Sequence, residues 1–312
     1  MSVADGNSIL VTGARGFIGS HIVTHARDRG LRPFAAYRGA SGPGAIHMDV
    51  RDGASVDAAF RQCAPTFVVH CAAYGVNYAE QDLDEAVAVN IHGSLRVLEA
   101  AARYGTQRLV HLGSCFEYGT HEGFIAEDAA LEPTAIYGAS KAAATLIMRE
   151  RARTWGVRLI VARPFGTWGP REATYRLVPQ VLTACLRGSP LELTPCDVVR
   201  DQTYVEDMAA HVCSLLFAPD IATGTIVNVG SGQRVVLRDF VLAIARMFDA
   251  EHLMQFGALP HRATEMASLV ADVSRLRVLV GDLSQTSLAA GIRRTVAEMQ
   301  MGEIAVRDCE DS

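Results

Sequence analysis

The chain has 312 residues, of which 49% are hydrophobic and 20% charged, and its formal net charge is −5. These values are typical of a globular protein with a large core, built as one big domain or two smaller ones. Because arginine and lysine form no basic block, the composition argues against a nucleic-acid-binding protein, although a few local arginines suffice to bind one anionic small molecule.

The cysteines and the apolar runs lead us to expect a reduced protein of the cytoplasm. No CxxC pair occurs, so neither a disulfide framework nor a zinc site is indicated, and no bound metal is expected. The N-terminal residues lack the basic and apolar regions of a secretory signal. No apolar run approaches the roughly 20 residues that cross a bilayer. The seven cysteines are Cys63, Cys71, Cys115, Cys185, Cys196, Cys213 and Cys309.

Short apolar runs alternate with helical patterns through the first half of the chain. Strands are predicted at 8–13, 32–38, 66–73, 108–114 and 157–164. Helices are predicted between them, at 16–30, 54–63, 82–105 and 134–156. This alternation predicts an α/β fold of the Rossmann type, a doubly wound parallel sheet with helices on both faces.

The second half of the chain is less regular and predicts a smaller, mixed region. Helices are expected at 175–190, 236–248 and 287–300, with a short strand at 191–193. Ligands of such folds bind at the carboxyl ends of the strands, so this region is expected to bind the substrate there. The predicted division is a dinucleotide-binding domain at 1–170, joined by 196–235, and a substrate-binding region at 171–195 and 236–312.

The stretch "ILVTGARGFIGSH" places Gly13, Gly16 and Gly19 between a predicted strand and a predicted helix. Glycines at this junction let the backbone turn tightly and approach a pyrophosphate, which the helix N-terminus then binds. A plain turn with a packing glycine is the alternative. The GxxGxxG spacing differs from the usual GxGxxG, but its place at the first strand–helix junction favours dinucleotide binding.

The end of the second predicted strand indicates which nicotinamide cofactor is bound. An NAD site usually has a carboxylate there for the ribose 2′-hydroxyl, whereas "FAAYRGAS" has Arg38 and no acid. An arginine attracts a 2′-phosphate, and Arg15 in the glycine turn could add a second charge. The sequence therefore favours NADP over NAD, unless both arginines are solvated surface residues. Asp49 could hydrogen-bond the adenine.

A tyrosine and a lysine in "IYGASKAAA" are candidates for proton transfer. Tyr137 and Lys141 are four residues apart, so they share one face of a predicted helix. A nearby ammonium favours the phenolate, so the pair could exchange a proton with a carbinol or carbonyl oxygen. A YxxxK pair also occurs often by chance on helix surfaces. It gains weight from Ser114, which follows an earlier predicted strand.

These three features together resemble the extended branch of the short-chain dehydrogenase/reductase superfamily, whose members modify nucleotide sugars. "VTGARGFIGSH" is similar to its TGxxGFIG motif, and "GSCFEYG" to its serine-containing strand end. "VVHCAA" and "VNIHGSLRVLEAA" resemble the segments around the nicotinamide ribose. "RPFGTWGP" and "VRDQTYVEDMA" resemble its RxFNxYGP and RDxxxVxD segments, and "GALPHRATEM" and "TSLAAGIRRTV" resemble its C-terminal substrate-side segments.

The resemblance implies a role for each matching residue. Tyr137 would be the acid/base, Lys141 would hold the nicotinamide ribose, and Ser114 would hydrogen-bond the reacting oxygen. Arg200 and Arg262 would hold the nucleotide diphosphate of the substrate. The residues implied in cofactor binding are Gly13, Arg15, Gly16, Phe17, Ile18, Gly19, Arg38, Asp49, Val50, Ala72, Asn90, Tyr137 and Lys141.

Two further implications concern the substrate and the assembly. The family often has an asparagine where this chain has Gly166, so one contact to the sugar nucleotide is lost or comes from elsewhere. The long helices at roughly 83–104 and 135–155 commonly form a four-helix bundle between two subunits in this family, so a homodimer is expected.

The residues after Ser114 distinguish the reactions of the family. The 4,6-dehydratases carry an Asp-Glu pair where this chain has Cys115 and Phe116, and phenylalanine cannot act as a base. The epimerase-reductases that make GDP-fucose carry a cysteine and a histidine where this chain has Phe116 and Arg176. Alternation along a strand would point Cys115 away from the site, as a small buried filler. Glu117 suggests no role.

What remains is hydride transfer with a tyrosine as proton donor. The sequence predicts NADPH-dependent reduction of the 4-keto group of a 4-keto-6-deoxyhexose that is linked to a nucleotide, preferably TDP. The alternative is an NAD-dependent nucleotide-sugar 4-epimerase, which keeps its cofactor bound and returns the hydride to the other face. A non-catalytic nucleotide-binding protein would be expected to have lost Tyr137 or Lys141, and both are present.

Overall fold

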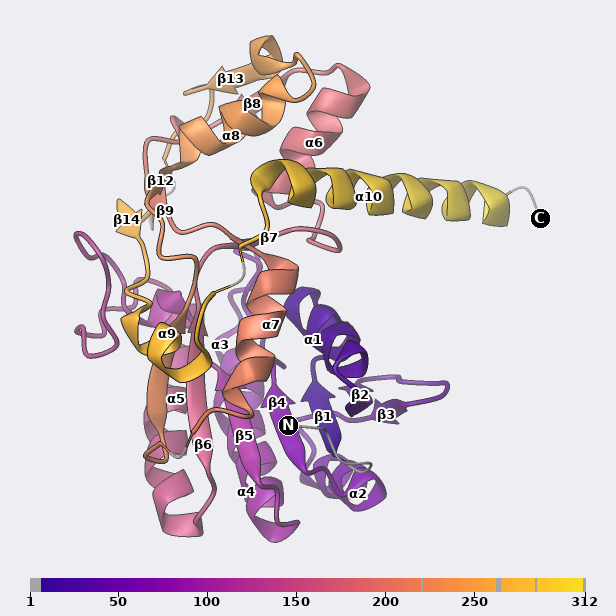
Figure 1. The fold of residues 1–312 in the computed structure, drawn as a ribbon, viewed down its shortest axis with the longest axis vertical. Helices are drawn as coiled ribbons and strands as arrows, with labels where there is room; N and C mark the ends of the chain where they lie inside the picture. The colour runs from indigo at the N-terminus through magenta and orange to yellow at the C-terminus, as the bar shows by residue number, and fades with distance from the viewer. Residues whose placement is uncertain (1–6, 220, 262–264, 284, 311–312) are drawn as a thin grey trace.

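The computed structural model describes residues 7–219, 221–261, 265–283 and 285–310, with side chains up to residue 300. Its centre is a seven-stranded, all-parallel sheet in the order β11-β6-β5-β4-β1-β2-β3 (Figure 1). The predicted Rossmann-type α/β fold is therefore confirmed. The strands are β1 Ser8–Thr12, β2 Arg32–Tyr37, β3 Ala45–His47, β4 Phe67–His70, β5 Arg108–Leu112, β6 Leu159–Pro164 and β11 Thr225–Val229.

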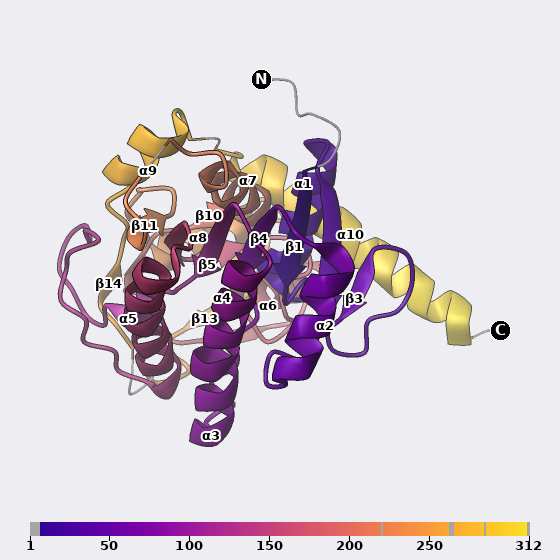
Figure 2. The same cartoon turned by 90° about the horizontal axis from the view of Figure 1, so that it is seen from below.

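Helices cover both faces of this sheet, as Figure 2 shows from below. One face packs against α1, α7 and α9, and the other against α2, α4 and α5. Successive side chains of β1 point to opposite faces of the sheet, so Ile9 and Val11 belong to one core and Leu10 to the other. The helices are α1 Phe17–Asp28, α2 Gly53–Cys63, α4 Ser94–Arg103, α5 Ile136–Trp155, α7 Val205–Leu215 and α9 Ser274–Val280.

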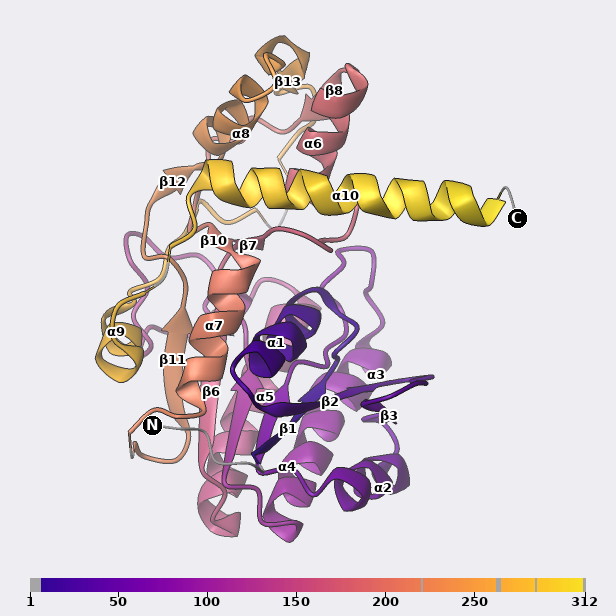
Figure 3. The same ribbon diagram turned by 45° about the vertical axis from the view of Figure 1, so that its right-hand side comes forward.

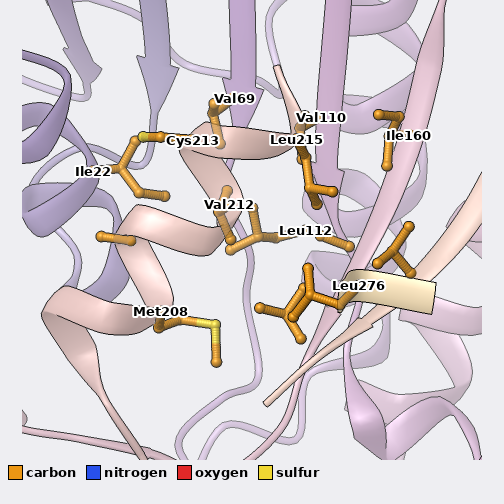
Figure 4. Packing of buried hydrophobic residues seen from close by; sticks show 14 of the residues in the cluster. Ile22, Val69, Val110, Leu112, Ile160, Met208, Val212, Cys213, Leu215 and Leu276 are labelled. Atoms are coloured by element: carbon orange, nitrogen blue, oxygen red, sulfur yellow. The ribbon is translucent and has the colours of Figure 1, made fainter. Parts of the chain in front are cut away.

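The core between the sheet, α1 and α7 holds the first strand–helix junction in place (Figure 4). Ile22 of α1 and Val212 of α7 are fully buried against Val69 and Val110 of the sheet. Met208, Leu215 and Leu276 extend the same layer. Burial of each such side chain contributes about 1.5–3 kcal/mol, so the amino end of α1 is fixed by its packed face.

The predicted single helix at 82–105 is wrong in one respect, because its middle is a π-helix. The segment comprises α3 Leu83–Ala86, the π-helix η1 Val87–Gly93 and then α4. Apolar periodicity cannot reveal the one extra residue per turn that a π-helix contains. The wider turn includes Asn90, which is fully buried beside Gly93.

Three small sheets lie above the carboxyl ends of the central strands (Figure 1). They pair β10 with β7, β12-β9-β14, and β13 with β8, and α6, α8 and α10 pack beside them. The predicted helices and the strand at 191–193 are present, and α10 extends further than predicted, running out from the body (Figure 3). The bounds are β7 Thr167–Trp168, β8 Leu191–Leu193, β9 Val199–Arg200, β10 Thr203–Tyr204, β12 Val235–Val236, β13 Met254–Phe256, β14 Ser268–Leu269, α6 Leu177–Arg187, α8 Leu237–Arg246 and α10 Leu288–Glu310, with 3-10 turns η2 Cys115–Glu117 and η3 Glu251–Leu253.

Within the described residues, no helix is both long and apolar enough to cross a membrane. No group of three or more His, Cys, Asp or Glu side chains in that part of the chain is placed to hold a metal ion. The cysteines with described side chains are free thiols, at Cys63, Cys71, Cys115, Cys185, Cys196 and Cys213.

Candidate active site

The glycine turn between β1 and α1 has the close approaches that its sequence predicts. Gly13 has φ +63°, and a Cβ there would lie 2.8 Å from the backbone nitrogen of Ala72. A Cβ on Gly19 would lie 2.4 Å from the Gly13 carbonyl oxygen, to which the Gly16 amide donates a 2.9 Å hydrogen bond. Side chains at Gly13 and Gly19 would therefore collide with backbone. The turn opens α1 without a side-chain cap at Gly16, and an uncapped helix N-terminus suits a pyrophosphate.

The predicted residues flanking this turn divide into exposed and packed groups. Arg15 and Arg38 are exposed, whereas Ile18 packs against the core and Phe17 meets the ring of His21 edge-on. Val50, predicted to touch the cofactor, is 7% exposed and packs against Gly93.

Asp49 lies near Arg38 and is paired with another arginine. Its side chain accepts hydrogen bonds from Arg51, which also reaches Glu85 at 2.9 Å. Hydrogen bonds from Arg51 lower the pKa of Asp49 to about 2, and Arg38 adds a smaller effect. An adenine amine would therefore share this carboxylate with Arg51.

Ser114 caps the short turn η2 through one hydrogen bond with Phe116 and one with Glu117. The Phe116 amide donates to the Ser114 hydroxyl at 3.2 Å, and the Ser114 amide donates to Glu117 Oε1 at 2.8 Å. This is a capping box, which fixes both the backbone and the side chain of its first residue. Ser114 is therefore held rigidly where β5 ends.

Glu117, for which the sequence suggested no role, is the centre of a buried network. It is 0% exposed, and its Oε2 accepts hydrogen bonds from Arg163 at 2.9 and 2.7 Å. Its Oε1 accepts from Thr145 of α5 at 3.1 Å. The Arg163 guanidinium also lies 4.4 Å from the ring centroid of Tyr118. Glu117 thereby joins β5, β6 and α5 at the point where Ser114 is positioned.

Cys115 is buried, as predicted, but the reason given by strand alternation is wrong. Residues 115–117 form a 3-10 turn, and Cys115 is 5% exposed within the hydrophobic core. Burial raises the pKa of its thiol to about 12, and the charge of Arg200 opposes part of that rise. The protonated thiol is therefore a poor nucleophile at neutral pH.

Tyr137 begins α5 beside this turn and is half-buried. Desolvation raises the pKa of its phenol to about 12, and the nearby Ser114 side chain acts in the opposite direction. The Ser114 side chain is therefore close enough to Tyr137 to influence the pKa of the phenol, as the predicted proximity requires. A phenol with this pKa is protonated at neutral pH, which suits a proton donor.

Lys141, one turn further along α5, is 2% exposed. No hydrogen bond or ion pair joins its ammonium to the described residues, and desolvation lowers its pKa to about 8. Two stacked imidazoles lie nearby, His70 and His111, with centroids 5.2 Å apart, and the charge of Lys141 lowers the pKa of each beyond the effect of burial. The free ammonium donors are available to a ribose hydroxyl.

The unpaired ammonium leads to a prediction about stability. Below pH 8 the folded protein must bury a charge, because the pKa of Lys141 falls from 10.5 when unfolded to about 8 when folded. Lys141→Met should raise the free energy of unfolding by about 1–3 kcal/mol at pH 7. The electrostatic part of this gain should vanish as pH rises from 8 to 10.5, since the folded protein then releases its proton first. Urea unfolding at pH 7 and pH 10 tests this, and an equal gain at both pH values would contradict it.

Two predicted cofactor residues support the site through local contacts. Asn90 accepts from the Tyr74 amide at 2.8 Å and donates to the Tyr74 carbonyl and to Ser140 of α5. It therefore ties the π-helix to the loop after β4 and to α5. The amide of Ala72 donates to Thr12 at 3.2 Å, so the loop after β4 is bonded to β1 beside the glycine turn.

The two arginines predicted to hold a diphosphate differ in what can be said of them. Arg200 of β9 is 14% exposed and donates to Glu265 at 2.7 Å, so a diphosphate would have to displace or share that carboxylate. Arg262 lies outside the described residues. At Gly166, the departure from the family pattern has a steric reason, because a Cβ there would lie 2.1 Å from the Asp201 carbonyl oxygen.

An ion pair close to Tyr137 was not predicted from the sequence. Arg176, which precedes α6, lies 3.3 Å from Glu172, and its charge lowers the pKa of Tyr137. The Glu172 side chain is 5% exposed, and its Oε2 finds no partner among the described residues. Burial raises the pKa of Glu172 to about 7, against the opposing effect of Arg176. The sequence offered no signal for this pair beyond the i, i+4 spacing.

The strand order and the turn after β1 place this protein in the Rossmann-type α/β class. Residues 9–230 match the NAD dependent epimerase/dehydratase family, and the chain belongs to that family. The resemblance to nucleotide-sugar-modifying enzymes drawn from the sequence motifs is thereby confirmed.

Relatives of known name include enzymes of more than one activity. The chain is 28% identical over 330 residues to a dTDP-glucose 4,6-dehydratase of Neisseria gonorrhoeae, covering 93% of this chain and 94% of that protein. It is 26% identical over 326 residues to a probable UDP-glucuronate 4-epimerase of Rhizobium meliloti, covering 92% and 95%.

Solved structures of similar proteins agree with the fold along nearly the whole chain. The UDP-glucose 4-epimerase of Thermus thermophilus, in complex with NAD, superposes with a TM-score of 0.82 at 28% identity, covering 94% of this chain and 99% of that one. MoeE5 in complex with UDP-glucuronic acid and NAD superposes with a TM-score of 0.84 at 26% identity, covering 95% and 99%.

Proposed function

We propose that the protein uses NADPH to reduce the 4-keto group of a 4-keto-6-deoxyhexose that is linked to a nucleotide, preferably TDP. The observation that carries this proposal is the pair that follows Ser114. Cys115 is buried with a pKa of about 12, and Phe116 is apolar, so neither adds an acid or a base beside Tyr137. Dehydration requires such an acid–base pair, whereas carbonyl reduction needs one proton donor.

The residues of the site fit a nicotinamide cofactor, because the turn has glycines at positions where a Cβ would collide with neighbouring backbone. When bound, the nicotinamide would supply the hydride. Tyr137 then donates its phenolic proton to the forming alkoxide, while Ser114 donates a hydrogen bond to the same oxygen. The Lys141 ammonium holds a ribose hydroxyl and stabilises the phenolate left on Tyr137, and solvent restores the proton.

The cofactor preference rests on Arg38 at the end of β2, where no carboxylate is present to repel a 2′-phosphate. Arg38→Asp should lower kcat/KM for NADPH by roughly 10- to 100-fold relative to NADH, because it removes a charge-assisted contact and adds a repulsive one. Arg27→Asp, on the last turn of α1, is the charge-matched control and should leave the ratio unchanged. An unaltered NADPH/NADH ratio in the Arg38 variant would remove the argument for NADP.

An NAD-dependent 4-epimerase is the second candidate, favoured by the NAD bound in two similar solved structures. The two functions differ in cofactor use, since an epimerase returns its hydride and consumes no cofactor. Incubation with NADPH and a panel of nucleotide 4-keto sugars, and without added cofactor with their 4-hydroxy counterparts, separates them, with product configuration read by NMR. Stoichiometric loss of NADPH supports reduction. Interconversion of 4-hydroxy sugars by tightly bound NAD, without cofactor loss, supports the epimerase.

We further propose the division of labour and the assembly that the family pattern implies. Residues 171–195 and 236–312 would bind the sugar nucleotide, over a dinucleotide-binding domain made of 1–170 and 196–235. A homodimer would form through α4 and α5, where Leu146 and Ile147 are 53% and 39% exposed. Such exposed apolar side chains on a helix face are typical of a subunit contact.

A further inference from the structure

Phe116 presents an aromatic ring to solvent at the edge of the candidate site. Its ring side chain is 40% exposed, although the residues on either side, Cys115 and Glu117, are 5% and 0% exposed. The turn therefore anchors its flanks in the core and leaves one apolar group outside. An exposed phenylalanine in this position is not needed for the packing of the core.

The ring of Phe116 lies directly beside the proton donor. Its centroid is 6.1 Å from that of Tyr137, with the ring planes at 70°, an edge-to-face contact. The two aromatic rings thus form adjacent parts of one wall. If Tyr137 and Ser114 act on the reacting oxygen as proposed above, Phe116 would border the substrate next to the carbon that reacts.

The backbone of Phe116 is held in place, and the edge-to-face contact with Tyr137 orients its ring. Its amide donates to the Ser114 hydroxyl at 3.2 Å. A Cβ on Gly138 would lie 2.3 Å from the Phe116 carbonyl oxygen, which shows how closely α5 packs against this turn. A ring held in this way can act as a rigid surface for one substituent of the substrate.

We propose that Phe116 determines specificity by packing against the apolar substituent on the ring carbon adjacent to the reacting carbonyl, and so selects a methyl-bearing, 6-deoxy sugar over its hydroxymethyl counterpart. This inference rests on the proposed function and adds the residue that distinguishes between sugar substrates. An apolar wall stabilises a methyl group, but offers no partner to a hydroxyl that loses its water there. Apolar contacts discriminate by roughly 10- to 200-fold at most, so the expected selectivity is moderate.

The test compares sugar nucleotides that differ only in the oxygen on C6. Dissociation constants for TDP-6-deoxyglucose and TDP-glucose are measured by calorimetry, and their NADP⁺-dependent oxidation gives kcat/KM in the reverse direction. The same pair in the galacto configuration covers the other C4 epimer. The wild-type protein should favour the 6-deoxy sugar by about 10-fold or more. Phe116→Ser should bring this ratio to about 1, and Phe116→Leu should retain most of it, because leucine keeps the apolar wall.

The matched control is Phe217→Ser. Phe217 is 45% exposed and packs against Phe67, which begins β4, at the end of the sheet opposite to Ser114. It should leave the ratio at the wild-type value. An unchanged ratio in Phe116→Ser, with turnover intact, overturns this inference and leaves the proposed reduction standing. If the wild-type protein oxidises or binds none of these sugars, the proposed function itself fails, and this inference fails with it.

Discussion

Tyr137→Phe should reduce turnover by roughly 10²- to 10⁴-fold while leaving cofactor affinity nearly unchanged. The substitution removes only the hydroxyl, whose pKa of about 12 keeps it protonated at neutral pH. The ring, its edge-to-face contact with Phe116 and the glycine turn all remain. Steady-state kinetics with a 4-keto sugar and fluorescence titration with NADPH measure the two quantities separately.

The matched control for this variant is Tyr204→Phe. Tyr204 is 2% exposed, its pKa is also raised to about 12 by burial, and its hydroxyl contacts Glu206 at 3.3 Å. It lies in β10 of the small sheets, so its loss should leave kcat close to the wild-type value. Comparable losses in both variants would point to general damage. Full activity in Tyr137→Phe would refute the assigned proton donor.

Glu117→Ala should lower the free energy of unfolding by about 3–5 kcal/mol, because it leaves the buried Arg163 charge without its carboxylate. It also removes the acceptor for the Ser114 amide, so the serine should lose its fixed position. Glu117→Gln keeps an acceptor of the same shape and should fold with a smaller loss. Urea unfolding monitors stability for both variants.

A positioning role for Glu117 also has a kinetic signature. In Glu117→Gln, kcat should fall more than KM rises, since the serine and tyrosine act on the reacting oxygen and not on the nucleotide. Glu99→Gln is the control, because its partner Arg103 is on the surface and the pair should have little influence on stability or kcat. If Glu117→Ala unfolds at the same urea midpoint as the wild-type protein, the account of the network is contradicted.

The parts of the site that are local in sequence could be predicted from it. The glycine turn is one strand–helix junction, and the clash that excludes a side chain at Gly19 is with Gly13, although Gly13 itself also meets the distant backbone of Ala72. The proximity of Ser114 and Tyr137 could be predicted because Ser114 follows the carboxyl end of β5 and Tyr137 lies in the first turn of α5, the helix that follows it. Both features are present in the structure. The roles assigned to these residues in binding and catalysis remain predictions.

The parts that depend on distant partners could not be predicted. Glu117 acquires its role from Arg163 and Thr145, which are 46 and 28 residues away. Arg200 was assigned to a diphosphate from its motif, yet its observed partner is Glu265, 65 residues away. The π-helix at Val87–Gly93 escaped detection because the apolar spacing also fits an α-helix. Pairwise contacts between separate elements leave no periodic signal in one sequence.

The measurement that tests the central claim most directly is transfer of deuterium from 4-deuterated NADPH to a TDP-4-keto-6-deoxyhexose. The reduction proposed here predicts one deuterium on C4 of the product for each NADPH consumed, and loss of this transfer in Tyr137→Phe. If the 4-keto sugar leaves NADPH unconsumed, and a TDP-6-deoxyhexose supplied in its place is interconverted at C4 without gaining deuterium, the account is contradicted and the protein keeps its own hydride.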